Sequence, residues 1–409
     1  MKKLYCLYLL SLCPLGIAAQ SQSDIPDEKS LYETVTKIEK KTDKFNLYLN
    51  MHSSFNVGWA DKSFDQSAFR MDQLRIEARG NINDWIYYRW RQRLNRGNNG
   101  SDAIDNLPAS IDYAAVGFNV TPKFSIFGGK QCTVYGGFEF DLNPIEIYEY
   151  SDMIENMSNF MTGVTFTYDF PASQQLAFQV LDSRSSSFED TYGYLPTNND
   201  QTFTDQYGYT PEAITKSKAS FVYTLNWNGS FADGLLKTRW SASILNEAKK
   251  KNMYYYALGT ELNLDKVNTF FDFMYSREAI DRNGIMTSII NNSDYQRDEL
   301  YTAMNAKYMS YVWKFNYRVA PKVNLFVKGM YETAGLYAGS NEGREEGRYR
   351  TAWGYLGGVE YYPMKTNLHF FLTFIGRTYL YTDRAKELGF HNYSTQRIST
   401  GFIYQLPLF

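Results

Sequence analysis

The sequence contains few of the residues that build disulfide frameworks and metal centres. Among 409 residues there are three cysteines, three histidines and 11 prolines. Cys6 and Cys13 lie in the first 20 residues, so a chain that loses this segment keeps Cys132 alone and has no partner for a disulfide. His52, His369 and His391 are widely separated in the sequence and predict no metal site. We therefore expect neither a bound metal nor a cofactor.

Long apolar runs are also absent. After residue 19 no uninterrupted apolar stretch is long enough for a transmembrane helix, which needs about 20 residues. Residues 1–19 begin with Lys2 and Lys3, continue with a short apolar run and end in small residues, the pattern of a secretory signal peptide. A membrane anchor is disfavoured because the run is short. A lipoprotein modified at Cys13 is disfavoured because Leu12 precedes that cysteine.

Neither sign of charge is in large excess. The formal net charge is −2, and loss of Lys2 and Lys3 with the signal peptide makes it −4, which does not indicate a nucleic-acid partner. Aromatic residues, in contrast, make up 17% of a chain whose mean hydropathy is −0.45. This combination is typical of membrane strands that end in the headgroup region, and also of aromatic-rich soluble β proteins.

Side chains alternate in character along residues 84–95. In an extended strand successive side chains point to opposite faces. One face then carries Arg89, Arg91 and Arg93, and the other carries Ile86, Tyr88, Trp90 and Leu94. A soluble sheet buries its apolar face in a core, whereas a membrane barrel turns that face to lipid and its polar face to an aqueous lumen.

Alternation with a period of two continues from residue 45 to the end of the chain. Before it, residues 20–44 predict a periplasmic linker with a short helix over 27–44, because Leu31, Val35 and Ile38 recur at helical spacing among charged residues. This helix is either solvated or a small coiled-coil device. The expected strands are 45–58, 68–80, 84–95, 110–120, 123–131, 160–170, 174–182, 217–228, 234–246, 252–264, 267–277, 304–319, 323–333, 349–362, 366–380 and 393–408.

The connections between these strands alternate in length. Those at 80–84, 121–123, 171–173, 264–266, 320–322 and 363–365 are tight, and 228–234 is slightly longer. The intervening connections are long and polar: 59–67, 96–109, 131–159, 183–216, 278–303, 334–348 and 381–392, with 247–251 the compact exception. Short turns at one end and long loops at the other are typical of outer-membrane barrels. We therefore predict an all-β fold, a transmembrane antiparallel β-barrel of about 16 strands over residues 45–409.

One long connection, residues 132–160, predicts a constriction. It contains no lysine or arginine, and its acidic residues are Glu139, Asp141, Glu146, Glu149, Asp152 and Glu155. It is either a solvated surface loop or a loop folded into the lumen with its carboxylates facing the channel.

Opposite this loop we expect a basic face lining the pore. Its predicted members are Arg75, Arg79, Arg89, Arg91 and Arg93, extended by Lys314 and Arg318. The planar guanidinium matches carboxylate and phosphate groups, so such a face indicates anionic solutes.

Four segments resemble the phosphate-selective porin O and P family in its Bacteroidetes-type branch. They are FNLYLNM at 45–51, QLRIEARG at 73–80, YRWRQRLN at 88–95 and GKQCTVYGGFEFDLNPIEIYEYS at 129–151. The resemblance is densest from 45 to 182. It implies a trimeric 16-stranded porin with a ladder of arginines in its lumen, to which the five arginines above could correspond. The acidic loop departs from a purely cationic funnel and looks more like the transverse charges of general porins.

These observations predict an outer-membrane porin, not an enzyme, for passive diffusion of small hydrophilic solutes with a bias to anions such as phosphate. Outer-membrane lipid and a homotrimeric assembly are the expected partners. The alternatives are a saccharide-selective channel, a non-conducting barrel and an outer-membrane enzyme. A sugar channel needs aromatic residues on the lumen face, and most here alternate outward. An enzyme needs a nucleophile beside a histidine, for which only His52 near Ser53 and Ser54 is a candidate.

Overall fold

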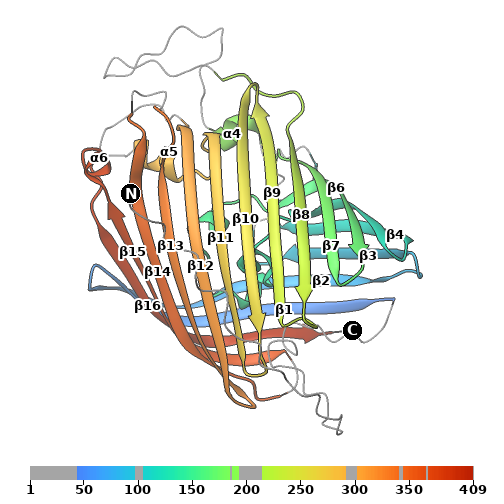
Figure 1. Ribbon diagram of the computed structural model, residues 1–409. Helices are drawn as coiled ribbons and strands as arrows, with labels where there is room; N and C mark the ends of the chain where they lie inside the picture. Colours follow the sequence, from blue (N-terminus) through green and yellow to red (C-terminus); the bar gives the residue numbers. More distant parts are fainter. Residues whose placement is uncertain are drawn as a thin grey trace, which may run out of the picture.

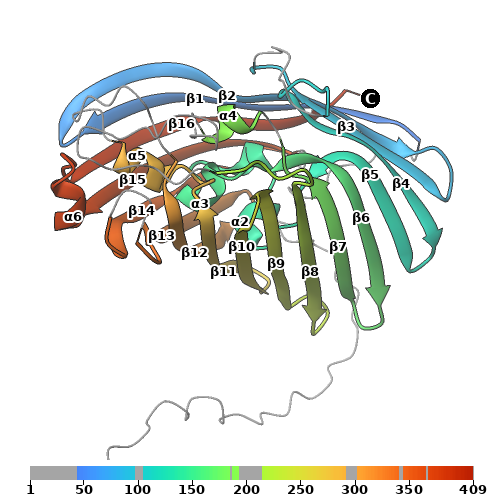
Figure 2. The same cartoon turned by 90° about the horizontal axis from the view of Figure 1, so that it is seen from above.

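The strands of this chain close into a single barrel. The computed structural model describes residues 44–96, 105–184, 187–192, 214–291, 302–339, 344–364 and 367–408. Sixteen antiparallel strands each pair with their neighbours in the sequence, and β1 pairs with β16 to complete the ring. Figure 1 shows β8 to β15 in front of the strongly tilted β1 and β2, and Figure 2 looks into the barrel from above. Closure pairs every edge strand, which a membrane-spanning sheet requires.

The strand bounds follow the alternating segments of the sequence closely. They are β1 Asn46–Ala60, β2 Ser63–Asn81, β3 Ile86–Arg93, β4 Ile111–Thr121, β5 Phe124–Cys132, β6 Phe160–Phe170, β7 Gln174–Asp182, β8 Phe221–Phe231, β9 Leu236–Ala248, β10 Lys251–Asn263, β11 Val267–Ile280, β12 Met304–Ala320, β13 Val323–Leu336, β14 Gly347–Tyr361, β15 Leu368–Tyr381 and β16 Tyr393–Pro407. Short helices lie in the connections: α2 Phe138–Asp141, η1 Pro144–Glu146, α3 Asp152–Glu155, α4 Phe188–Tyr192, α5 Ile285–Ile290 and α6 Asp383–Lys386.

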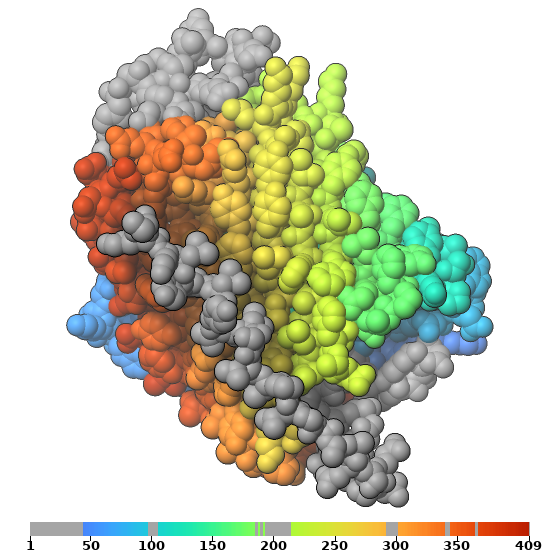
Figure 3. All heavy atoms as spheres, in the orientation of Figure 1, coloured from blue at the N-terminus to red at the C-terminus, as the bar shows by residue number. Residues whose placement is uncertain are grey.

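The outer surface of the barrel is apolar and the inner surface is mixed. On β12, Trp313 and Tyr317 are exposed on the outside, whereas Ser310 and Asn316, at positions of the other parity, are buried on the inside. The broad outer face of β8 to β14 fills the front of Figure 3. Its exposed large residues include Leu225, Trp240, Leu258, Phe271, Trp353 and Tyr355. Soluble proteins seldom expose so continuous an apolar surface, and lipid is its natural environment.

The tight connections lie at one end of the barrel, as predicted, but the connection between β1 and β2 differs from the prediction. Residues 59–67 do not form a long loop. Ala60 pairs with Ser63, so only Asp61 and Lys62 connect the strands. Both have positive φ, 45° and 70°, as a two-residue type I′ hairpin turn requires. The sequence did not reveal this turn because neither position is a glycine or asparagine.

The connection after β5 folds into the barrel. We call residues 133–159 the inner loop; its helices α2 and α3 lie inside the ring of strands in Figure 2. Loop side chains Phe138, Ile145, Tyr148, Met153 and Ile154 are buried in a core shared with wall residues Phe270, Met274, Phe326, Met330 and Phe371. Burying such side chains contributes about 1.5–3 kcal/mol each. The barrel therefore holds a packed core along one wall and is not water-filled throughout.

Some predictions concern residues outside the described part of the chain. The signal peptide at 1–19 and almost all of the segment 20–44, with its predicted helix, fall there. Among the residues that are described, none of the helices has both the length and the apolar character needed to cross a membrane.

Candidate functional site

Five arginines form one inner wall of the barrel, which we call the arginine wall: Arg75, Arg79, Arg89, Arg91 and Arg93. They lie on the neighbouring strands β2 and β3. The register sets Arg75 directly opposite Arg93 and Arg79 directly opposite Arg89. Directly opposite residues in an antiparallel pair share a face, so the predicted stacking of these arginines is present. Like charges at this spacing repel one another unless acids lie between them.

Two buried acids supply that compensation. The carboxylate of Asp112 accepts hydrogen bonds from Arg75 Nη1 at 3.0 Å, Arg91 Nε at 3.1 Å and Arg93 Nε at 2.8 Å. Glu77 accepts one from Arg89 Nε at 2.9 Å. Asp112 is 0% exposed and Glu77 is 1% exposed, so both carboxylates are almost completely shielded by the guanidiniums.

A β-bulge directs Asp112 into the barrel. The ladder between β3 and β4 pairs Arg91 with Tyr113 and the next residue, Gln92, with Ile111, which leaves Asp112 as the extra residue. A bulge changes the direction of a side chain that strict alternation would send to the other face. Strict alternation along β4 would place Asp112 on the lipid side, and the predicted site did not include this residue.

The inner loop is fixed to the wall opposite the arginines. Gly136 and Gly137 have φ of 76° and 85°, values that residues other than glycine rarely adopt. This conformation turns the chain across the lumen. Immediately after this turn, the backbone N–H groups of Phe138 and Glu139 donate to the Asp272 carboxylate on β11, at 2.9 and 2.8 Å. A Cβ on Gly137 would lie 3.3 Å from Asp272 Oδ2, a closer contact than most Cβ atoms make.

Most carboxylates of the inner loop pair with basic residues of β9 to β16. Glu139 is fully buried and contacts Lys328 Nζ at 2.5 Å. Asp141 lies 2.9 Å from Arg239 Nε, and Glu149 lies 2.8 Å from Arg397 Nη2. Asp152 pairs with both Arg350 and Arg377. Within the described part of the chain, Glu146 and Glu155 are the two predicted loop acids that form no ion pair.

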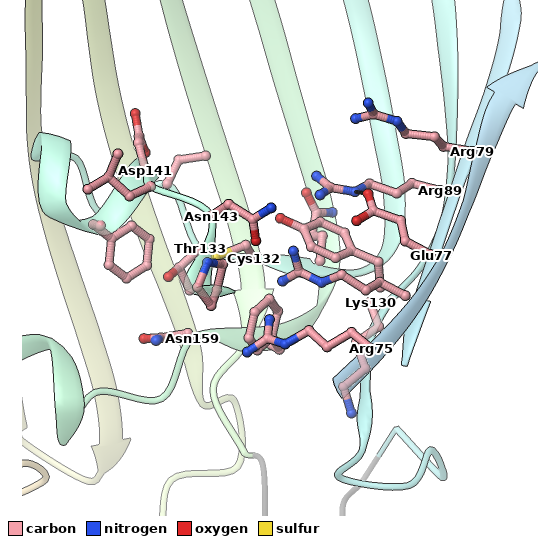
Figure 4. Close-up of a pocket in the computed structure, with 18 of the residues that line it drawn as sticks. Arg75, Glu77, Arg79, Arg89, Lys130, Cys132, Thr133, Asp141, Asn143 and Asn159 are labelled. Atoms are coloured by element: carbon pink, nitrogen blue, oxygen red, sulfur yellow. Dashed lines mark hydrogen bonds and ion pairs between the residues drawn. The ribbon is translucent and has the colours of Figure 1, made fainter. Parts of the chain in front are cut away.

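A cavity of about 1320 Å³ separates the inner loop from the arginine wall. All five predicted arginines line it, and from the loop so do Asp141, Glu146 and Glu155. In Figure 4, Arg79 and Arg89 extend from their strands towards the loop segment that carries Asp141 and Asn143. The lining contains nine lysines and arginines against five aspartates and glutamates. The open part of the lumen is thus positive on one side and partly negative on the other.

The ionisation of the loop acids depends on their position between loop and wall. Burial raises the pKa of Glu146 to about 8; nearby Glu360 adds to this rise and Lys314 opposes it. Partial desolvation inside the lumen also raises the pKa of Asp141, although Arg239 lowers it, and partial desolvation together with Glu149 raises the pKa of Glu155. At neutral pH a part of the loop's negative charge is therefore absent from the channel.

The remaining predicted site residues lie elsewhere. Glu139, Glu149 and Asp152 are used to hold the loop and do not line the cavity. Lys314 is buried under the loop, 5.8 Å from the Phe326 ring centroid. Arg318 lies at the tight-turn end of β12, where it contacts the Asp265 carboxylate at 3.2 Å, so it does not extend the arginine wall.

Several cavity residues were missed by the sequence analysis. Lys130 on β5, which pairs with Asp105 at 3.0 Å, and Arg239 on β9 line the cavity. So do eight aromatic residues, Tyr87, Tyr88, Tyr113, Phe127, Phe138, Phe140, Tyr150 and Phe160. Side chains alternate regularly along β12 and β15, but these aromatic residues come from the irregular inner loop and from β3 to β6. The alternation pattern therefore did not predict that they face the lumen.

His52, the one candidate for enzymatic chemistry, lies against the inner loop. Its ring contacts Tyr148 and Phe371 edge to face, with centroids 5.9 and 5.2 Å away, and is 96% buried. Its neighbour across the sheet is Asp72, at 3.8 Å. Within the described ranges no group of three or more His, Cys, Asp and Glu side chains could hold a metal ion.

Comparison with known proteins agrees with this architecture. The family described as Phosphate-selective porin O and P matches residues 45–406. No curated protein matches the chain.

Solved structures share the fold at low sequence identity. The outer membrane channel DcaP of Acinetobacter baumannii aligns with a TM-score of 0.56 at 12% identity, covering 90% of this chain and 99% of that one. The trimer form of OmpT from Vibrio cholerae aligns with a TM-score of 0.50 at 12% identity, covering 89% and 100%. An anion-selective porin from Comamonas acidovorans aligns with a TM-score of 0.50 at 10% identity, covering 89% and 99%.

These findings confirm the predicted barrel and its place in the outer membrane, and they indicate a channel rather than an enzyme. With a family match across nearly the whole barrel and a lumen kept open beside the inner loop, the chain belongs to the phosphate-selective porin O and P family and is a passive diffusion porin of the outer membrane.

Proposed function

We propose that this porin favours small anions, phosphate among them, which pass between the arginine wall and the inner loop. The observation that carries the proposal is the composition of the cavity, nine basic against five acidic side chains. A narrow passage lined by an excess of one charge concentrates ions of the opposite sign. Arginine suits phosphate because two N–H groups of its fork can bind two oxygens at once.

The exposed arginines contribute most to the proposed preference for anions. The side chains of Arg89 and Arg93 are 30% and 22% exposed, whereas those of Arg75 and Arg91 are 2% and 5% exposed. The buried pair, held by Asp112, orients the wall and contributes charge from behind it. Arg79 completes the exposed set, with its guanidinium carbon 5.2 Å from the Tyr48 ring centroid. A solute therefore meets Arg79, Arg89 and Arg93 first.

The loop acids set an opposing field. Asp141, Glu146 and Glu155 line the cavity across from the arginines. A field across the channel orders polar solutes and permits cations to pass along the loop side, so the selectivity we propose is a bias and not strict exclusion.

We also propose that the porin is a homotrimer. The similarity of fold to a porin solved in a trimer form and the resemblance of the sequence to a trimeric family both support this assembly. Chemical cross-linking of the protein in native outer membranes checks it: a band at three times the monomer mass supports the trimer, and a monomer band alone contradicts it.

The selectivity is tested by the reversal potential of the purified protein in a planar bilayer under a KCl gradient, followed by titration with phosphate. We expect a reversal potential whose sign shows that chloride permeates more readily than potassium. We also expect the chloride current to fall as phosphate is added. A double substitution, Arg79→Gln with Arg89→Gln, should move the reversal potential towards zero and weaken the effect of phosphate.

Arg318→Gln is the matched control. It removes the same charge from a residue of the same barrel that lies at the tight-turn end beside Asp265, away from the cavity. An equal shift in the control and the double variant would contradict a selective role for the arginine wall. Cation selectivity in the unmodified protein would contradict the anion bias itself.

A further inference from the structure

Guanidinium groups and aromatic rings alternate along the cavity side of the arginine wall. Arg89 Cζ lies 3.9 Å from the centroid of the Tyr113 ring, and Arg91 Cζ lies 4.8 Å from the same centroid. Arg91 and Arg93 lie 5.4 and 5.5 Å from the centroid of Phe160. We call these five residues, Arg89, Tyr113, Arg91, Phe160 and Arg93, the alternating stack. All five line the cavity, and both rings are only half buried.

The stack leaves hydrogen-bond donors available in the planes of its guanidiniums. The acids behind the stack accept hydrogen bonds from the Nε atoms. Glu77 accepts one from Arg89 Nε, and Asp112 accepts one each from Arg91 Nε and Arg93 Nε. Each guanidinium has five N–H donors, so donors on the terminal nitrogens of the exposed Arg89 and Arg93 are left for an anion in the channel. Stacking on a ring also makes the guanidinium less hydrated, which lowers the cost of exchanging water for a ligand.

The opposite side of the cavity carries apolar surface beside its acids. The inner loop contributes the partly exposed side chains of Phe140 and Met157 to the lining. Phe140 makes an edge contact with Tyr135, at 5.7 Å between centroids, which holds its ring in place. A small hydrated anion makes no use of these surfaces. An anion that carries its charge on a flat apolar ring can use apolar surface as well as the guanidiniums.

We propose that the alternating stack binds carboxylates carried on a planar aromatic ring in preference to inorganic phosphate. The carboxylate lies in the plane of Arg89 or Arg93, and the ring of the solute contacts the edge of Tyr113 or Phe160, because guanidiniums cover the faces of these rings. This inference rests on the proposed anion bias and adds the class of solute that the same wall selects.

The test compares two carboxylates of equal charge and similar size, benzoate and cyclohexanecarboxylate, as blockers of chloride current through the full-length protein in a planar bilayer. A ring contact contributes roughly a two- to twelvefold difference in binding. We therefore expect half-block by benzoate at a concentration roughly two- to twelvefold lower than for cyclohexanecarboxylate, and lower than for phosphate. Glucuronate, a non-aromatic sugar acid, should resemble cyclohexanecarboxylate.

The variants Tyr113→Leu and Phe160→Leu remove a ring and keep an apolar side chain. Each should weaken the block by benzoate more than the block by phosphate, because a phosphate ion has no ring to contact the missing side chain. Phe271→Leu is the control, because Phe271 is exposed on the outer face of β11. The heat-dependent mobility of each variant on a denaturing gel checks that its barrel has folded.

The possible results separate the two proposals. Anion-selective conductance with equal block by the two carboxylates, or with glucuronate as the stronger blocker, overturns this inference and leaves the proposed function standing. A benzoate preference that survives both leucine variants also overturns it. Cation-selective conductance overturns the proposed function and the inference with it.

Discussion

Arg75 on β2 lies directly opposite Arg93 on β3, and both guanidiniums donate to the same carboxylate, Asp112, at 3.0 and 2.8 Å. Two like charges at adjacent positions of a sheet are destabilising without such an acid. Asp112 therefore lets the barrel keep its arginines close together, and its burial keeps its own charge away from the solute. This relationship leads to the first prediction.

Asp112→Asn should increase the preference for anions. The substitution removes one negative charge from behind the arginine wall and keeps a side chain of the same size. We expect the reversal potential under a KCl gradient to move further in the direction of chloride permeation. Asp265→Asn, at the exposed turn beside Arg318, is the control and should leave the potential unchanged. A shift of the Asp112 variant towards cations would show that the acid has another role.

Lys328→Met should destabilise the docked inner loop. Lys328 Nζ contacts Glu139 at 2.5 Å, and the side chains of the two residues are 5% and 0% exposed. Removing one member of a buried ion pair costs about 3–5 kcal/mol, because the other charge stays buried without its partner. The expected result is a lower temperature for the loss of folded mobility on a denaturing gel. Lys386→Met breaks only the exposed pair with Asp383, and we expect that transition temperature to stay the same.

Asp272→Ala should release the start of the inner loop. Its carboxylate accepts the N–H groups of Phe138 and Glu139, and hydrogen bonds to a charged group contribute about 1.5–3 kcal/mol each. Without them we expect α2 to leave the wall of β11 part of the time. Single-channel recordings should then show larger current noise and a second conductance level. An unchanged, quiet current would mean that the apolar core alone holds the loop.

The selectivity should depend on pH through Glu146. Its pKa is raised to about 8, so the carboxyl is mostly neutral below that pH and negative above it. Between about pH 6 and about pH 10 the loop side of the cavity gains negative charge, and the anion preference should fall. The pKa values of Asp141 and Glu155 are also raised, and each adds negative charge to the same side of the cavity when it ionises. In the variant Glu146→Gln the reversal potential should change less over this interval; an identical pH profile would exclude Glu146 as the titrating group.

Much of the fold could be predicted because its main signal is local. The alternation of side chains placed β6 at 160–170 and β7 at 174–182, the bounds that the structure has. The same period put Arg89, Arg91 and Arg93 on one face, and the close connection between β2 and β3 fixed which arginines lie opposite one another. The β1–β2 turn was missed because positive φ at Asp61 and Lys62 has no signature in those residue types.

The partners of the inner loop could not be predicted. Asp272 receives the N–H of Phe138 across 134 positions of sequence, and Arg377 reaches Asp152 across 225. Nothing in the sequence near either residue indicates the pairing, because it depends on how far the loop crosses the lumen after Gly136 and Gly137.

Along the regularly alternating stretches, the sequence by itself determined which side chains face lipid and which face the lumen, because a strand alternates with a fixed period of two. Only the tertiary structure decided what each inward charge does. Closure of the barrel brings β11 to β16 across from β2 and β3, so most loop acids meet basic residues of the far wall and only three line the open cavity. The bulge at Asp112 then turned a residue from the lipid side to the inside and set the charge of the arginine wall.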